Sequence, residues 1–298
     1  MDLALGAATV GVSPLAGTSP RTFAELLWRI AIVLANLTVD AQSGRWVRSP
    51  SYDRLDPSEK SAVSYFLGIT QAQVMCQRLL QVDCLTHVDA LLEAVGQPRA
   101  KVRSDLVGYS TSNRMSVAVE AKGRTNGYTA QLLRKTKGQA RKLPMVTLPH
   151  VPAGTTHSPI ALVPWFDTDG SWHSRLEDRP SESVSKVPWQ AVLAQFYRPV
   201  ADELVDALEL GIARYDDRGV FVPLRPGLTL GMARGMFDTV RSMQSAWPDR
   251  DLESIGFDLN GALVDAWERP MIEDQRFGIA SWTKDCVLAM SASGSLFG

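Results

Sequence analysis

The sequence predicts an α/β fold, and three observations lead to this prediction. Segments with the apolar spacing of helices fill most of the first hundred residues. Two short apolar runs then follow, separated by a polar turn, and they predict paired strands. A further helical segment and a further apolar run come directly after them. This alternation along the chain is typical of a sheet covered by helices.

The elements before these two apolar runs are helical. The residue pattern predicts helices over 23–39, from Pro57-Ser58-Glu59 to Leu80, and over 86–95, with a polar loop over 41–57. Gly96 and Pro98 end the third helix, since both residues stop helices. Residues 1–20 are rich in Gly, Ala, Ser, Thr and Pro and predict a loose arm.

The middle of the chain predicts a hairpin followed by a helix and a strand. The pattern predicts strands over 105–109 and 115–122, a turn over 110–114, a helix over 128–143 and a strand over 160–163. Farther along, we expect a polar, exposed segment over 175–186, helices over 190–210 and 228–245, and strands over 219–222 and 286–290. The chain therefore divides into a helical N-terminal region (1–85), a core (86–166) and a C-terminal α/β region (167–298).

Composition excludes several classes of protein. The chain has 298 residues, of which 45% are hydrophobic, and this is too apolar for a largely disordered chain. No run of about twenty apolar residues is present, so a membrane span is not expected. The N-terminus shows no signal-peptide pattern. Cys76, Cys84 and Cys286 are too scattered for a disulfide framework or a thiolate metal site, so we expect reduced thiols in a cytoplasmic protein.

Charge is balanced over the whole chain but not locally. The net charge is −1, yet the window from Arg99 to Lys142 holds eleven of the 31 basic residues and only two of the 32 acidic ones. A basic segment inside an otherwise acidic protein is the pattern expected of a surface that binds a polyanion. The alternative is a solvated charged helix with no ligand.

The two acids of this window occupy particular positions. Asp105 begins the first predicted strand, and Glu120-Ala121-Lys122 ends the second. Residues i and i+2 of a strand lie on one face, so Glu120 and Lys122 point the same way. If the hairpin brings Asp105 alongside, two carboxylates and the Ala121 carbonyl converge, and such oxygen ligands suit Mg²⁺ or Mn²⁺. One acid-x-Lys triplet is expected by chance, so the argument depends on this context.

These motifs resemble a known family. The segments Arg103-Ser-Asp105-Leu-Val-Gly, Val-Ala-Val-Glu120-Ala-Lys122-Gly-Arg and Lys137-Gly-Gln139-Ala are similar to the PD-(D/E)XK, or restriction-endonuclease-like, nuclease superfamily. The resemblance covers roughly residues 86–165, about a quarter of the chain. It implies a core made of a helix, a mixed central sheet and a crossing helix. Ser104 stands where the family name has proline.

The resemblance also implies roles for individual residues. Asp105, Glu120 and the Ala121 carbonyl would bind the metal, and Lys122 would be the catalytic lysine. Gln139, on a stripe of the 128–143 helix with Leu132 and Leu143, would face the site; the alternative is that it covers the edge of the core. Further candidates for the site are Glu93, with Asp89 and His87 behind it, and Lys135. The expected contacts to nucleic-acid phosphates are Arg103, Arg124, Arg134, Lys137, Arg141 and Lys142.

The sequence therefore favours a Mg²⁺- or Mn²⁺-dependent nuclease acting on DNA, and RNA is the alternative substrate that the sequence leaves open. By analogy, a role in bacterial restriction or anti-phage defence would fit, as would a homodimer or a partner protein. A second hypothesis is an inactive nucleic-acid-binding or assembly module of the same fold. A third assigns an unrelated activity to the C-terminal half. His150, His157 and His173 are expected on the surface, and the acid pairs Asp167, Asp169, Asp216 and Asp217 are expected to form turns.

Overall fold

The structure is a computed structural model of the chain. It describes residues 21–82, 84–94, 97–98, 101, 103–110, 115–142, 156–178, 181–184, 189–217, 219–225, 228–244, 279–282 and 288–291. They form two compact units, one mainly of Glu25–Val192 and the other mainly of Leu193–Gly298. The N-terminal helices thus belong to the same unit as the central sheet.

Within this part of the chain, no helix combines the length and the apolar character that crossing a membrane would require.

The first unit begins with helices, as expected, but its first loop is more structured than the sequence suggested. The elements are α2 (Arg21–Asn36), β1 (Leu37–Val39), β2 (Trp46–Arg48), α3 (Pro50–Arg54) and α4 (Pro57–Leu80). The start of α4 is fixed by a capping box, in which Asp56 and Glu59 each accept from the other's backbone N–H. The segment 41–57, expected to be a loop, contains β2 and α3.

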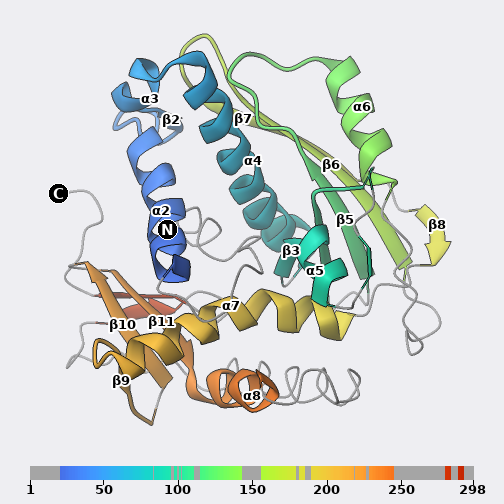
Figure 1. The fold of residues 1–298 in the computed structure, drawn as a ribbon. Coiled ribbons are helices and arrows are strands. Elements are labelled where there is room, and N and C mark those ends of the chain that lie inside the picture. The colour runs from blue at the N-terminus through green and yellow to red at the C-terminus, as the bar shows by residue number, and fades with distance from the viewer. Residues whose placement is uncertain are drawn as a thin grey trace. The chain divides into compact units, whose positions relative to one another are not determined.

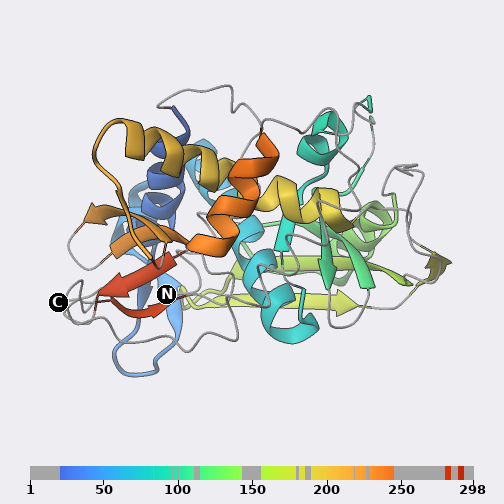
Figure 2. The same ribbon diagram turned by 90° about the horizontal axis from the view of Figure 1, so that it is seen from below.

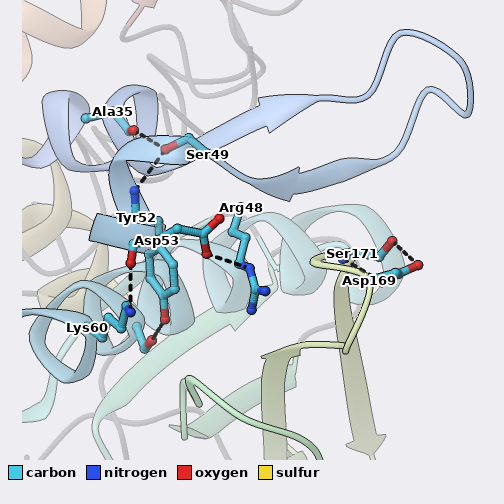
Figure 3. Close-up of polar contacts among 9 residues, drawn as sticks. Ala35, Arg48, Ser49, Tyr52, Asp53, Lys60, Asp169 and Ser171 are labelled. Carbon is cyan, nitrogen blue, oxygen red and sulfur yellow. Dashed lines mark hydrogen bonds and ion pairs between the residues drawn. The ribbon is translucent and has the colours of Figure 1, made fainter. Parts of the chain in front are cut away.

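Buried polar contacts join the first helices (Figure 3). The Ser49 hydroxyl donates to the carbonyl of Ala35 in α2 and accepts from the N–H of Tyr52 in α3. The Tyr52 ring is buried, and its hydroxyl lies 2.9 Å from that of Ser64 in α4. This network fixes the first half of α4, which later proves to lie beside the candidate site.

A mixed sheet forms the centre of the first unit. Its strands are β3 (Cys84–His87), β4 (Leu106–Ser110), β5 (Met115–Ala121), β6 (Thr156–Phe166), β7 (Trp172–Asp178) and β8 (Ser181–Val184), in the order β3-β4-β5-β6-β7 with β8 also paired to β6. The antiparallel β4–β5 hairpin confirms the prediction. Two short helices, α5 (Val88–Ala94) and α6 (Ala130–Ala140), complete the unit, and the connection containing α6 joins β5 to the parallel strand β6.

Helices α4 and α6 cover opposite faces of this sheet (Figure 1). On one face, Val119 of β5 packs in a buried cluster with Ile69 of α4. On the other, Ala161 and Val163 of β6 pack with Leu133 of α6. Three expectations need correction here: residues 84–87 form a strand before the short helix α5, β6 is much longer than 160–163, and the polar segment 175–186 contributes to strands β7 and β8.

The second unit contains an antiparallel sheet. Its elements are β9 (Arg214–Tyr215), β10 (Gly219–Arg225), β11 (Leu228–Ala233), α8 (Arg234–Gln244), β12 (Ile279–Trp282) and β13 (Leu288–Ser291), preceded by α7 (Trp189–Glu209). The strand order is β12-β13-β11-β10-β9, and β12 and β13 are seen in red in Figure 2. The segment 228–245, expected as one helix, divides into β11 and α8. The predicted strand at 219–222 and helix at 190–210 are confirmed.

Candidate active site

The hairpin brings the two predicted acids to the same end of the sheet. Asp105 directly precedes β4, and Glu120 is the last residue but one of β5. Leu106 pairs with Val119, so Asp105 and Glu120 occupy neighbouring positions across the antiparallel pair. The Glu120 side chain is buried, with 1% of its surface exposed, and Asp105 is half-buried.

Backbone amides hold both carboxylates in place. The N–H of Asp105 donates to Glu120 Oε2 at 3.1 Å, and the N–H of Ala121 donates to Asp105 Oδ2 at 3.1 Å. The N–H and C=O of one strand residue point to the same side, so the Ala121 carbonyl also lies on the Asp105 side of β5. The structure thus brings the three expected oxygen donors together.

Lys122 completes the group. Its ammonium forms an ion pair with Glu120 Oε1, while about a third of the Lys122 side chain (35%) stays exposed. Its backbone N–H donates to the carbonyl of Leu162, which ties the end of β5 to β6. Lys122 and Glu120 lie on the face of the sheet that α6 covers, because they alternate with Val119 and Ala121, which face α4.

The electrostatics of the site favour a bound cation. Burial raises the pKa of Glu120, and the negative charge of Asp105 raises it further, while Lys122 opposes both effects. Two carboxylates held together in a buried position repel one another, and a divalent cation relieves such repulsion. The donor set of oxygens alone fits a hard cation such as Mg²⁺ or Mn²⁺.

The surroundings of Asp105 contain further polar groups. His87 Nδ1 lies 3.3 Å from the Asp105 carbonyl oxygen, and burial lowers the pKa of His87. Asp89 forms an ion pair with Arg103, and its Oδ1 is buried without a hydrogen-bond partner among the described residues, as is the Ser104 hydroxyl. The acid of α5 that lies near Asp105 is therefore Asp89; Glu93 is exposed toward the end of that helix.

Helix α6 departs from the expectation at two residues. Lys137 was expected to contact phosphate, but its side chain is buried, and its ammonium donates to the carbonyls of Pro159 and Glu177. This is a correction: a buried ammonium that joins α6 to β6 and β7 is not available to a ligand. Pro159 pairs with Ala118, two residues before Glu120 in β5, so Lys137 lies away from the acidic pair.

Gln139 lies farther still from the acidic pair. Leu133 packs on Ala161 and Val163, whereas Lys137 contacts Pro159, so α6 runs back toward the start of β6. The structure therefore does not bring Gln139 to the carboxylates; its Oε1 is buried without a hydrogen-bond partner among the described residues. The other expected cations are exposed, except for the half-buried Arg103: they are Arg124, Arg134, Lys135, Arg141 and Lys142.

A second cluster lies at the turn between β6 and β7. Ligand atoms of Asp167, Asp169 and His173 lie within 4.8 Å of one another, and these residue types are common in metal sites. The Asp169 carboxylate accepts from the N–H and hydroxyl of Ser171, both at 2.8 Å (Figure 3), and Asp167 accepts from the N–H of Thr168. These bonds confirm the two aspartates as turn formers.

Sequence reasoning missed the close approach of α4 to the end of β5. A Cβ atom on Gly123 would lie 1.7 Å from the Ser64 carbonyl oxygen and 3.3 Å from the Tyr65 nitrogen. The first half of α4 therefore contacts Gly123, the residue after Lys122, and this contact places Tyr65 at the same end of the sheet as the acidic pair. Burial raises the pKa of Tyr65, and the nearby carboxylates of Asp105 and Glu120 raise it further. The only sequence signal was glycine directly after the triplet.

Comparison with models of known protein families, with curated proteins and with solved structures finds no match for this chain.

Proposed function

We propose that this chain is a metal-dependent nuclease that hydrolyses phosphodiester bonds in DNA, and that its first unit has a restriction-endonuclease-like core. The order of elements supports the fold. A helix (α4) precedes an antiparallel hairpin (β4–β5), and a connection through α6 leads to the parallel strand β6. This is the helix, mixed sheet and crossing helix that the sequence resemblance implies.

One observation carries the proposed activity. Asp105 and Glu120, fifteen residues apart, meet at the end of the β4–β5 hairpin with Lys122 on the same face. A buried carboxylate next to a second carboxylate is costly for stability, so its presence at the end of two inner strands favours a functional role over a structural one. The accompanying lysine can orient an attacking water or offset the negative charge that develops on a phosphate.

Each residue has a role in this proposal. Asp105, Glu120 and the Ala121 carbonyl would hold Mg²⁺ or Mn²⁺, and the amides of Asp105 and Ala121 orient the two carboxylates. When bound, the ion polarises the phosphoryl oxygen and lowers the pKa of a coordinated water. Lys122, partly exposed and paired with Glu120, would orient the attacking water and offset the negative charge that develops on the phosphate.

The substrate backbone would be held by the exposed cations that follow β5. Arg124 follows Lys122 by two residues, and four more cations lie on or just after α6, namely Arg134, Lys135, Arg141 and Lys142. Contacts of this kind are independent of base sequence and weaken as salt is added. We therefore expect affinity that falls with ionic strength.

The test is cleavage of plasmid, linear duplex, single-stranded DNA and RNA by wild type, Lys122→Ala and Lys60→Ala, each with Mg²⁺, Mn²⁺ or EDTA. Lys60 is a matched control, because it is a partly exposed lysine on the first turn of α4 whose ammonium donates to the Asp53 carbonyl. We expect metal-dependent cutting by wild type and Lys60→Ala, and none by Lys122→Ala.

Two other results would contradict the proposal in different ways. Salt-sensitive binding without cutting, equal in all three proteins, would indicate the non-catalytic binding module. Absence of both cutting and binding would remove the nuclease hypothesis and direct attention to the second unit.

A further inference from the structure

Two large aromatic side chains are exposed on the helices beside the candidate site. Trp28 of α2 is 49% exposed and Tyr65 of α4 is 42% exposed. Both contact Phe66, with ring centroids at 4.7 Å and 5.4 Å, and both contacts are edge-to-face. The Arg29 guanidinium lies 5.7 Å from the Phe66 centroid. We call Trp28, Tyr65 and Phe66 the aromatic shelf.

The shelf lies at the end of the sheet that carries the acidic pair, on the side that α4 covers. Tyr65 follows Ser64, whose carbonyl rests on Gly123, the residue after Lys122. The Tyr65 phenol is also near enough to Asp105 and Glu120 for both carboxylates to affect its ionisation. A pair of water-exposed rings beside a candidate catalytic group needs an explanation, because large exposed apolar surfaces commonly mark binding sites.

Cations continue from the site just beyond the end of β5. Lys122 and Arg124 are two residues apart, the backbone N–H of each donates to a carbonyl of β6, and both side chains are at least partly exposed. Arg124 forms a backbone bridge with Trp165, whose ring stacks with Tyr128 at 5.1 Å between centroids. This end of the sheet therefore offers positive charge to phosphates and aromatic surface to bases, a combination typical of proteins that bind single strands.

We propose that the aromatic shelf stacks an unpaired nucleobase next to the scissile phosphodiester, so that the enzyme acts on single-stranded DNA or on the unpaired end of a duplex. This inference rests on the proposed nuclease function. Bases inside a duplex already stack on each other, and only an unpaired base presents its face to a protein ring. Stacking depends little on base identity, so the shelf selects the state of the strand rather than its sequence.

The experiment compares wild type, Tyr65→Ala, Tyr65→Phe and Leu79→Ala. Leu79 is an exposed apolar residue on the same helix, fourteen positions or about 21 Å from Tyr65. Dissociation constants are measured by fluorescence anisotropy for a labelled single strand of mixed sequence and for its blunt duplex. Ca²⁺ replaces Mg²⁺ to prevent cutting, and circular dichroism checks that each variant is folded.

We expect wild type to bind the single strand more tightly than the duplex. Tyr65→Ala should weaken single-strand binding about tenfold, within the range for loss of one base–aromatic stack. The duplex constant should change little. Tyr65→Phe keeps the ring and should restore single-strand affinity, and Leu79→Ala should match wild type for both DNAs.

Two results would overturn the inference without removing the nuclease function. The first is that wild type binds the duplex more tightly than the single strand. The second is that Tyr65→Ala changes the dissociation constants of the two DNAs equally, or changes neither, while Lys122-dependent cleavage is intact. An equal absence of effect would be expected if the shelf binds a partner protein instead. Failure of wild type both to bind and to cut any nucleic acid would remove the proposed function as well.

Discussion

Gly123 allows α4 to rest on the end of β5, and replacing it with alanine tests the geometry of the whole site. The added Cβ would lie 1.7 Å from the Ser64 carbonyl oxygen and 2.5 Å from the Ser64 carbonyl carbon. Both contacts involve backbone atoms, so no side-chain rotation can relieve them. The helix and the strand would have to separate by more than about 1 Å at a closely packed contact.

The expected cost follows from this geometry. Overpacking of a core costs roughly 1–3 kcal/mol, and a backbone–backbone clash belongs at or above the upper end. We therefore expect Gly123→Ala to lower the free energy of unfolding by about 3 kcal/mol or more. In urea unfolding followed by circular dichroism, this corresponds to a midpoint lower by about 1 M or more.

A matched control is available in the same unit. A Cβ on Gly138, in α6, would meet nothing within 4 Å, and the residue is exposed. Gly138→Ala should therefore stabilise the protein by about 0.5–1 kcal/mol, because alanine favours a helix interior more than glycine does. The same substitution thus gives opposite signs at the two sites. If the free energy of unfolding of Gly123→Ala is within 1 kcal/mol of that of wild type, α4 does not contact the end of β5 as described.

Two further predictions concern charged groups. Glu120→Gln removes a buried charge facing Asp105, so in EDTA the variant should have a melting temperature no lower than that of wild type. Millimolar Mg²⁺ should raise the melting temperature of wild type but not that of the variant. An equal effect of Mg²⁺ on the two proteins would contradict the metal site. Burial raises the pKa of Asp202 to about 6 from an ordinary 3.8, so the native state binds this proton more tightly than the unfolded state does. The contribution of the protonated Asp202 carboxyl to the free energy of unfolding is therefore complete below pH 3.8 and is lost as the pH rises through 6. Asp202→Asn should be about 1–2 kcal/mol more stable than wild type at pH 8, after allowance for partial solvent exposure, with a smaller difference at pH 4; equal chemical denaturation curves at both pH values would refute this.

The sequence predicts the acidic pair because its signal is local. Asp105 and Glu120 belong to one hairpin, and the alternation of apolar residues fixes both the strands and the face that Glu120 occupies. The start of α4 was similarly readable, since Asp56, Pro57 and Glu59 act on one helix turn. In both cases, the residues that decide the structure lie close together in the chain.

Features that depend on distant contacts were harder to predict. The stripe of α6 expected to face inward included Leu132 and Gln139, whereas the buried residues are Leu133, Thr136, Lys137 and Ala140. This shift by one position follows from the position of α6 on β6 and β7, where the carbonyls of Pro159 and Glu177 satisfy the Lys137 ammonium. Sequence identifies a lysine but does not identify acceptors 22 and 40 residues away.

Short strands were misassigned for a related reason. Residues 86 and 87 were expected to begin a helix, yet they belong to β3 (84–87), which pairs with β4 at the edge of the sheet. Likewise, Leu228–Ala233 is apolar enough to be joined to the helix that follows, but it pairs with β10 on one side and β13 on the other. Pairing partners, rather than intrinsic propensity, decide such segments.

The division between hairpin and crossover also has a consequence for folding kinetics. Asp105 and Glu120 come together when a single hairpin closes, which involves a short loop and a small loss of chain entropy. By contrast, β6 must return across α6 to pair with β5, and Glu120 lies opposite Ala161 only after about forty residues. Such long-range parallel pairing is slow. The acidic pair is therefore expected to form early in folding, before β6 pairs with β5 and the Leu162 carbonyl accepts from the N–H of Lys122.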